Sequence, residues 1–465
     1  MLEKVFKAYD IRALYPQPLD EEVAWRVGYG TAEFLVSRAA ATGLDSPMAR
    51  HVVVGRDMRR SSPSLSAALK QGIRDFGANI VDVGLVDTPF VYFAVNHLGC
   101  AGGVQVTASH NPPQYNGFKI SQARAKPVGT GSGLERIREL AELADPARSA
   151  RQGGREEPKD LWWAYRAHLL RLLDSHVLDG SARLRVVVDA SNGMAGAAVP
   201  RVLDGVPGLE LIKLNFDIAS GEFAHDPNPL VEANLTQLKA AVAREGADFG
   251  VCFDGDADRC ILVDEAGRTV GCDLLLAALV GDVLRENPGA AIVYDLRSSR
   301  AVAEAVRACG GVPVESRVGH VFMKSKLAET ASPIGGELSG HFYFRDMWNT
   351  DSGLRTLIAA LSLLARSGKT LGQLIEPLKA YSQSGEINFE CPDKAAALAA
   401  LRAAYPAART AELDGLSLDN GDFWCNVRAS NTEPLLRLNL EAADRATMER
   451  SLEAVAKHLG RQVAH

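Results

Sequence analysis

Short apolar runs that each end in a glycine-rich or acidic loop recur along this chain and alternate with segments of helical periodicity. The first series predicts strands over 51–54, 79–83 and 103–107 and helices over 64–76 and 89–97. Strands and helices that alternate in this way are typical of an α/β layered domain, in which helices cover the faces of a sheet. This alternation constrains the fold more than any single residue does.

The same order of elements recurs twice more without a repeated sequence. The second series has strands over 183–188, 209–214 and 247–253 and a helix over 234–245, and the third has helices over 272–285 and 299–309 around a strand over 291–294. We therefore expect three topologically similar α/β/α domains with mixed sheets.

The last part of the chain predicts a smaller α+β domain instead. Strands over 387–389, 423–427 and 435–439 and helices over 394–405 and 445–459 are expected there. With 465 residues, the chain exceeds the roughly 250–300 residues at which a single hydrophobic core stops growing. The expected domains are 1–155, 156–267, 268–380 and 381–465, with linkers near 145–158 and 381–385.

Charge and cysteine content narrow the cellular setting. The net charge is −6 without a long basic run, so non-specific nucleic-acid binding has little electrostatic support. No apolar run approaches the roughly 18 residues of a membrane span, and charges occupy the amino-terminal segment where a signal peptide needs an apolar core. Seven scattered cysteines without a Cys-x-x-Cys pair argue against a disulfide framework or a zinc site and predict a reducing, cytoplasmic location.

Ser109 follows the apolar strand over 103–107, and small or polar neighbours precede Pro112 and Pro113. A hydroxyl on a strand-to-loop turn can be presented to a substrate as a nucleophile. The absence of a surrounding Gly-x-Ser-x-Gly argues against an α/β-hydrolase elbow. An isolated loop serine more often makes a local turn, so the case for Ser109 depends on the other loops.

Asp254, Asp256 and Asp258 stand at alternate positions directly after a strand. Three such carboxylates repel one another unless a cation lies among them. The spacing resembles the start of an EF-hand, but Arg259 occupies the position that needs glycine, and strands flank the loop, which argues against calcium. Three monodentate oxygens leave octahedral positions for a phosphate and water, which suits Mg²⁺. The alternative is a solvated acidic turn.

Two later loops carry polar groups that suit a sugar phosphate. Glu337, Ser339 and His341 offer a carboxylate, a hydroxyl and an imidazole to sugar hydroxyls. The loop over 428–434 combines a guanidinium, hydroxyls, an amide and backbone N–H groups, which suits a dianionic phosphate. Local pairing and a simple hairpin turn are the alternatives. Cations beside these loops could together form a positive site: Arg12, Arg56, Lys119, Arg259 and Lys324.

In this order and spacing, the loops make the chain resemble the α-D-phosphohexomutase superfamily. The matching segments are Y-D-I-R at 9–12, T-A-S-H-N-P at 107–112, D-G-D-A-D-R at 254–259, G-E-L-S-G-H at 336–341 and R-A-S-N-T-E-P at 428–434. The resemblance covers essentially the whole chain and is strongest to the bacterial phosphomannomutase/phosphoglucomutase group. It implies four domains around a central cleft, with one loop of each domain facing that cleft.

The resemblance also implies a role for each loop. Ser109 would be the phosphoserine, and Asp254, Asp256 and Asp258 would bind Mg²⁺ with a phosphoserine oxygen as a further ligand. Glu337 and Ser339 would hold the sugar O3 and O4 hydroxyls. The other implied residues are Lys119, Arg259 and His110 beside the reacting groups, Arg428, Ser430, Asn431 and Thr432 at the non-reacting phosphate, and Tyr9, Arg12, Arg297, His320 and His341 as further substrate contacts.

The third and fourth loops look like those of mannose and glucose mutases rather than glucosamine mutases. The expected reaction is the reversible interconversion of hexose 1-phosphate and hexose 6-phosphate through a phosphoserine and a hexose 1,6-bisphosphate. The choice between mannose and glucose stays open, as does the choice between Lys119 and a histidine as the base. Two residues depart from the family pattern: Ala13 replaces a usual glycine, and Arg297 replaces a frequent substrate-facing lysine.

Three other functions compete with this one: a phosphoglucosamine mutase, a phosphatase or one-way phosphotransferase, and a non-catalytic sugar-phosphate-binding protein on the same fold. We expect small sugar phosphates as the partners, no nucleic acid or membrane partner, and a monomer.

Overall fold

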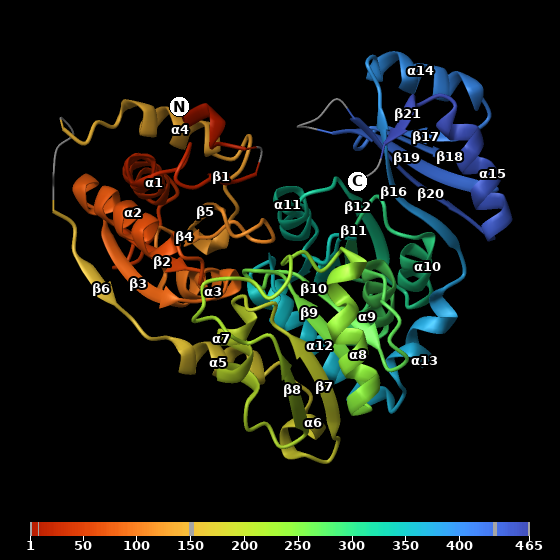
Figure 1. Ribbon diagram of the computed structural model, residues 1–465, viewed down its shortest axis with the longest axis horizontal. Helices are drawn as coiled ribbons and strands as arrows, with labels where there is room; N and C mark the ends of the chain where they lie inside the picture. The colour runs from red at the N-terminus through yellow and green to blue at the C-terminus, as the bar shows by residue number, and fades with distance from the viewer. Residues whose placement is uncertain (1, 8, 148–152, 431–434, 464–465) are drawn as a thin grey trace. The chain divides into compact units, whose positions relative to one another are not determined.

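The computed structural model describes residues 2–7, 9–147, 153–430 and 435–463 (Figure 1). The chain forms two compact units. Unit 1 comprises Met1–Val270 and Ser339–Gly372, and unit 2 comprises Gly271–Leu338 and Gln373–His465.

The first sheet of unit 1 has six strands in the order β1-β5-β4-β2-β3-β6. It is mixed, because β2 runs parallel to β3 and β4 whereas β5 runs antiparallel to β4 and β1. Helix α1 packs against α2 and α4, and Val52, Leu69 and Ile137 belong to the hydrophobic core. The elements are β1 (Ile11–Leu14), α1 (Glu21–Ala41), β2 (His51–Arg56), α2 (Ser62–Phe76), β3 (Asn79–Leu85), α3 (Thr88–Leu98), β4 (Gly102–Val106), β5 (Tyr115–Gln122), α4 (Leu134–Leu143) and β6 (Glu156–Pro158).

The second sheet of unit 1 has four strands in the order β10-β9-β7-β8. β7 runs parallel to β8 and β9, and β10 returns antiparallel to β9, so the loop between β9 and β10 is short. The elements are α5 (Trp162–Leu170), α6 (Ser175–Asp179), β7 (Leu184–Asp189), α7 (Ala195–Leu203), β8 (Leu209–Leu214), α8 (Thr236–Glu245), β9 (Phe249–Phe253) and β10 (Cys260–Asp264). Unit 1 also contains β14 (Phe342–Phe344), which pairs antiparallel with β15 (Thr350–Asp351), and α12 (Gly353–Ser367).

Unit 2 begins with a parallel arrangement in which β11 lies between β12 and β13. The elements of this part are α9 (Cys272–Glu286), β11 (Ala291–Asp295), α10 (Arg300–Ala308), β12 (Val312–Ser316), α11 (His320–Thr330) and β13 (Ile334–Gly336). Helix α13 (Leu371–Ile375) carries the chain from unit 1 back into unit 2.

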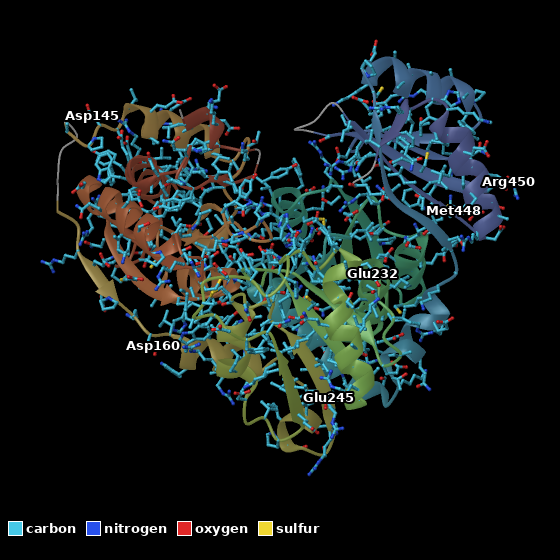
Figure 2. All side chains as sticks on the ribbon, viewed as in Figure 1. Asp145, Asp160, Glu232, Glu245, Met448 and Arg450 are labelled. Carbon is cyan, nitrogen blue, oxygen red and sulfur yellow. The ribbon has the colours of Figure 1, made fainter. Side chains whose placement is uncertain are left out.

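The end of unit 2 is a six-stranded sheet in the order β17-β18-β19-β20-β16-β21, and its neighbours pair antiparallel. On α15, Met448 packs against the hydrophobic core whereas Arg450 is exposed, and both are labelled in Figure 2. The elements are β16 (Ser382–Glu390), α14 (Lys394–Ala404), β17 (Arg409–Ala411), β18 (Leu416–Asp419), β19 (Phe423–Ala429), β20 (Leu435–Ala442), α15 (Arg445–Ala456) and β21 (Arg461–Val463).

The predicted fold class is confirmed, and the expected linkers stay predictions. Three mixed or parallel strand arrangements precede an antiparallel sheet with helices, in the predicted order. Both expected linkers contain strand residues: Glu156–Pro158 form β6, which pairs with β3, and β16 begins at Ser382. Glycine and charge in those stretches looked like linker composition, but both strands lie at or near sheet edges, where such residues are tolerated. Among the described residues, no helix has the length and apolarity to cross a membrane.

Candidate active site

Ser109 lies in the loop between β4 and β5 of unit 1. It is fully buried, and its Oγ donates a hydrogen bond to Oδ2 of Asp254 at 2.8 Å. Its backbone N–H donates to Oγ1 of Thr107 at 2.9 Å. The φ of Ser109 is 53°, in the left-handed region that residues other than glycine rarely adopt. Surrounding contacts must therefore hold this loop in its conformation.

Asp254, Asp256 and Asp258 lie in the loop between β9 and β10, and all three are buried. One carboxylate oxygen of each lies within 4.8 Å of those of the other two. Thr88, at the start of α3, donates its hydroxyl to Oδ2 of Asp256 at 2.5 Å and its backbone N–H to the Asp256 carbonyl at 3.1 Å. The two strands and α3 thus place an acidic cluster directly beside Ser109.

Lys119 on β5 supplies positive charge to this cluster. Its Nζ donates to Oδ2 of Asp256 at 2.7 Å and also to Oδ2 of Asp258. Burial alone would lower the pKa of Lys119, but the charges of Asp256 and Asp258 raise it above its ordinary value. Burial alone would raise the pKa of Asp256, and Lys119 lowers it below its ordinary value. Burial, with the charges of Asp258 and Asp256, holds the pKa of Asp254 well above its ordinary value.

The acidic cluster fits a metal ion. Among the described side chains, Oδ1 of Asp256 and Oδ1 of Asp258 are buried without a hydrogen-bond partner. A buried carboxylate oxygen without a partner is costly, so these atoms require a cation or a donor. Three hard oxygen ligands suit a hard divalent cation.

Arg259 and His341 also lie beside the acidic loop, at carboxylate atoms other than those that Lys119 binds. The Arg259 N–H donates to Oδ1 of Asp254 at 3.2 Å, and its Nε lies 3.8 Å from Oδ2 of the same carboxylate. A backbone bridge joins Arg259 to His341. Nδ1 of His341 lies 2.9 Å from Oδ2 of Asp351 and 3.9 Å from Oδ1 of Asp258. The His341 ring therefore lies beside the carboxylate of Asp351.

Arg12 and His110 complete the predicted residues near Ser109. The Arg12 guanidinium on β1 donates to Asp10 and to Oδ1 of Asn111, two residues after Ser109. The charge of Arg259 and burial lower the pKa of His110 well below its ordinary value. Tyr9 and Ser339 are half-buried in unit 1. Ala13 continues β1 and pairs with Asn116, so the departure from the family's glycine leaves this strand regular.

In unit 2, Glu337 follows β13 and is buried. Its Oε1 accepts the N–H of Gly319 at 2.7 Å, and Gly319 is the N-cap of α11, whose first residue is His320. The N–H of Leu338 donates to Oδ2 of Asp295 at 2.8 Å, so the end of β11 holds the residue after Glu337. The Glu337 carboxylate is thereby held at the start of α11, at the residue that precedes His320 in the sequence.

Three arginines of unit 2 converge on Glu386 of β16. Their nitrogens lie 2.6 Å (Arg428), 3.3 Å (Arg437) and 3.5 Å (Arg297) from its carboxylate. Arg297 also pairs with Asp295 at 2.8 Å. Burial alone would raise the pKa of Glu386, but Arg428 and Arg297 lower it below its ordinary value. Ser430 is buried, and the predicted contacts Asn431 and Thr432 lie outside the described residues.

Several residues of these networks were missed from the sequence. Arg59, Asp351, Glu386 and Arg437 carry no local motif, and Arg59, Glu386 and Arg437 find most of their partners far along the chain. The sequence instead suggested Arg56, whose side chain donates a hydrogen bond to the carbonyl of Asp57 at 3.4 Å. Arg59 sits in the same Gly-Arg-Asp-Met-Arg run and donates to the Ser109 carbonyl at 2.7 Å. The second arginine in this run was the only signal in the sequence that pointed to Arg59.

Comparison with known protein families agrees with this organisation. Four models of phosphoglucomutase/phosphomannomutase match the chain in order: α/β/α domain I over residues 3–145, domain II over 164–267, domain III over 272–381 and the C-terminal domain over 386–458. The chain belongs to the phosphoglucomutase/phosphomannomutase family. It is therefore an enzyme, an intramolecular phosphotransferase with hexose-phosphate mutase activity.

Individual relatives extend over nearly the full chain. A protein of Xanthomonas campestris pv. campestris (strain B100) named "Phosphohexose mutases" is 39% identical over 460 residues, which cover 98% of each chain. The phosphomannomutase of Escherichia coli (strain K12) is 37% identical over 450 residues, covering 94% of each chain. A crystal structure of a phosphoglucomutase/phosphomannomutase family protein from Burkholderia thailandensis is 33% identical, with a TM-score of 0.86 over 98% of this chain and 99% of that one.

Proposed function

We propose that this enzyme interconverts the 1- and 6-phosphates of mannose, glucose or both, through phosphorylated Ser109 and a hexose 1,6-bisphosphate. The observation that carries the proposal is the hydrogen bond from Ser109 Oγ to Asp254 at 2.8 Å, within a buried cluster that also holds Asp256, Asp258 and Lys119. A nucleophilic hydroxyl beside a cation-binding cluster is the arrangement that phosphoryl transfer requires.

In the proposed step, the bond from phosphorus to Oγ of phosphorylated Ser109 breaks, and a bond from phosphorus to a hexose hydroxyl oxygen forms. The proton of that hydroxyl leaves to a base, and a proton from an acid or from solvent reaches Oγ of Ser109, which ends as a hydroxyl. The second half-reaction runs the same exchange in reverse from the other phosphate, so no phosphate is lost. Arg259 stabilises the charge that develops on the phosphoryl oxygens near Asp254.

Mg²⁺ is the proposed cofactor, held by Asp254, Asp256 and Asp258. When bound, the ion would neutralise charge on the transferring phosphoryl group. A phosphoserine adds about −1.5 to −2 charge beside this buried cluster, which increases the need for a cation. Lys119 shares the same carboxylates, so it can balance part of their charge in each state of the cycle.

For the base, the geometry favours a histidine over Lys119. Lys119 already donates to two carboxylates, and their charges keep it protonated. His341 has Nδ1 at 2.9 Å from Asp351, an arrangement that directs one ring nitrogen to a carboxylate and leaves the other to exchange a proton. His110 stands beside Ser109 in the sequence and is the second candidate.

Unit 2 supplies the proposed contacts to the rest of the substrate. Arg428 and Arg437 face the single carboxylate of Glu386, which leaves one formal positive charge for an anionic phosphate. Ser430 and, from the sequence, Asn431 and Thr432 add hydroxyl and amide groups to this phosphate site. Glu337, and Ser339 of unit 1, are the proposed partners of the sugar O3 and O4 hydroxyls, and Tyr9, Arg12, Arg297 and His320 are proposed as further substrate contacts.

A product balance tests the proposal. Purified enzyme is incubated with glucose 1-phosphate, Mg²⁺ and a trace of glucose 1,6-bisphosphate, and glucose 6-phosphate and inorganic phosphate are measured together. Stoichiometric glucose 6-phosphate with no phosphate release is expected, whereas phosphate release without glucose 6-phosphate would indicate a phosphatase. Parallel assays with mannose and glucosamine 1-phosphates should give the lowest kcat/KM for glucosamine. Cytoplasmic location and the monomeric state stay predictions.

A further inference from the structure

Arg59 uses both terminal nitrogens of its guanidinium to hold the Ser109 loop. An arginine side chain has five N–H donors. The Arg59 side chain is fully buried, and Nε donates to Oδ2 of Asp57 at 3.0 Å. The terminal nitrogens donate to four backbone carbonyls of one loop: Ser109 at 2.7 Å, Asn111 at 2.7 Å, Pro112 at 2.8 Å and Tyr115 at 3.1 Å.

These hydrogen bonds, together the Arg59 clamp, account for the unusual backbone of the Ser109 loop. Ser109 has a φ of 53°, which costs free energy that other contacts must offset. Carbonyls that turn inward in so tight a loop also need donors, and Arg59 provides them. Since its hydrogen bonds go to the carbonyl of Ser109 itself and to three carbonyls that follow it, the position of Arg59 sets the position of the nucleophile.

Phe223 contacts the Arg59 guanidinium, and it belongs to the part of unit 1 that contains the second sheet. The Arg59 guanidinium carbon lies 4.8 Å from the centre of the Phe223 ring. A side chain added at Gly255, in the acidic loop, would lie 2.9 Å from Cζ of Phe223 and 2.4 Å from the Ser109 carbonyl oxygen. The ring, the acidic loop and the Ser109 loop therefore meet without room for another side chain.

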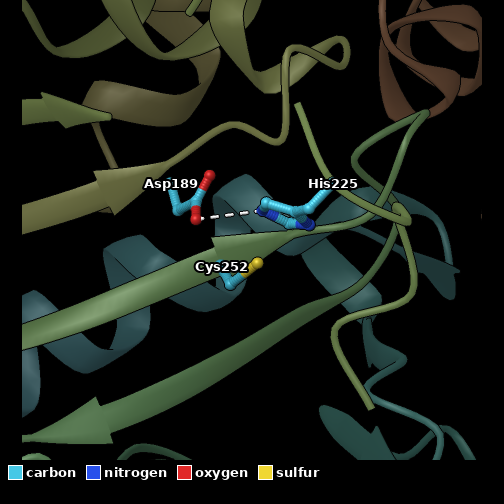
Figure 3. A group of neighbouring side chains, drawn as sticks. All are labelled: Asp189, His225 and Cys252. Atoms are coloured by element: carbon cyan, nitrogen blue, oxygen red, sulfur yellow. Dashed lines mark hydrogen bonds and ion pairs between the residues drawn. The ribbon is translucent and has the colours of Figure 1, made fainter. Parts of the chain in front are cut away.

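The segment that carries Phe223 is itself anchored. Nε2 of His225 lies 3.1 Å from Oδ2 of fully buried Asp189, at the end of β7, and Cys252 lies beside the pair (Figure 3). Nδ1 of His225 contacts the Asp226 carbonyl at 2.9 Å, and the N–H of Ala224 donates to the Ser191 carbonyl at 3.2 Å. These contacts, at the residues directly after Phe223, anchor its segment to the end of β7, which is a neighbour of the strand that ends at the acidic loop.

We propose that Arg59 and Phe223 are positioning residues that set the distance between Ser109 and the acidic cluster. Arg59 fixes the serine loop, and Phe223 ties that clamp to the acidic loop through Gly255. The inference rests on the proposed role of Ser109 as the phosphoserine. Phosphoryl transfer depends on alignment, and a displacement of about 1 Å can lower the rate about 100-fold.

The test compares Phe223→Ala, Phe223→Tyr and Phe76→Ala with the wild-type enzyme. Phe223 and Phe76 are both half-buried in unit 1, and Phe76 packs against the core at the end of α2, so its loss is a matched control for stability. For each protein, kcat and KM for glucose 1-phosphate are measured at saturating bisphosphate, together with the unfolding midpoint and the phosphate on Ser109 by mass spectrometry.

The expected result for Phe223→Ala is a fall in kcat of about 10- to 100-fold with KM within about twofold of wild type. Phe223→Tyr, which keeps the ring, should restore kcat to within about threefold. Phe76→Ala should lower the midpoint without changing kcat. Arg59→Lys should lower kcat as Phe223→Ala does, and the two effects should not multiply in the double variant, because both act on one loop.

A wild-type kcat for Phe223→Ala would overturn the positioning role, as would an equal loss in Phe76→Ala. Either result would leave the proposed function intact, provided that wild-type Ser109 carries phosphate and Ser109→Ala is inactive. An active wild-type enzyme that never carries phosphate on Ser109 would instead overturn the proposed function and the positioning role together.

Discussion

Replacing Lys119 by methionine should make the enzyme depend on a divalent cation for stability. Lys119 is 13% exposed, and its two partner carboxylates are 0% and 2% exposed, so the substitution removes the positive charge from a buried acidic cluster. Removing one partner of a buried ion pair costs about 3–5 kcal/mol, because the other charge is left uncompensated. We therefore expect Lys119→Met to lower the free energy of unfolding by about that amount when metal is absent.

A bound cation should return a large part of this loss. At 100 times its dissociation constant, a ligand that binds only the folded state stabilises by about 2.7 kcal/mol. In Lys119→Met the cation no longer competes with an ammonium for Asp256 and Asp258, so its stabilising effect should be larger than in the wild type.

Urea unfolding followed by tryptophan fluorescence, with chelator or with saturating Mg²⁺, measures both effects. Lys70→Met is the matched control, since Lys70 also bridges two carboxylates in unit 1, Asp82 at 2.5 Å and Glu156 at 2.6 Å. The control should lose stability without recovering it in Mg²⁺. Equal responses of the two variants to Mg²⁺ would refute the assignment of the acidic cluster as the cation site.

Three further predictions concern the networks around the site. Asp351→Asn should lower kcat about 10-fold and shift its pH profile while KM stays unchanged, because His341 loses its charged partner. Burial alone would lower the pKa of His225, but the hydrogen bond to Asp189 raises it. The stability that this histidine contributes is therefore fully present below its unfolded pKa, near 6.5, and is lost as the pH rises through the higher folded pKa. Between these two pKa values, the urea midpoint of the wild type should fall with rising pH by more than that of His225→Gln. Glu386→Gln should weaken unit 2 by removing the carboxylate that three arginines share, and inorganic phosphate should stabilise that variant more than the wild type in thermal unfolding.

The sequence predicted the strands and helices whose apolar runs or amphipathic patterns carry a clear periodicity, but it left many of the regular elements unassigned. Some of the unassigned elements have an unusual composition, whereas others, such as α1 and α12, do not. β5 (Tyr115–Gln122) contains Asn116, Lys119 and Ser121, and these polar residues serve the site or pair within the sheet, so the strand has no continuous apolar run. Helix α7 contains Pro200, and α11 buries Lys324, which hides the helical pattern in each.

The loops of the site were visible because several polar residues stand together in each. The residues that hold those loops in place were not visible in the sequence. Arg59 reaches carbonyls 50 to 56 positions away, and Glu386 meets Arg428 across 42 positions, so neither partner can be read from local spacing. An isolated charge in a sequence carries the same signal whether it is solvated or buried in such a network.

Transfer of labelled phosphate from Ser109 tests the central claim most directly. Enzyme that carries a radioactive phosphate on Ser109 is mixed with unlabelled glucose 6-phosphate, and the label is followed on protein and sugar over the time of one turnover. Label should pass to hexose phosphates at a rate no slower than kcat, and Ser109→Ala should neither accept label nor turn over. Turnover with the label still on the protein, or an active Ser109→Ala enzyme, would contradict the account.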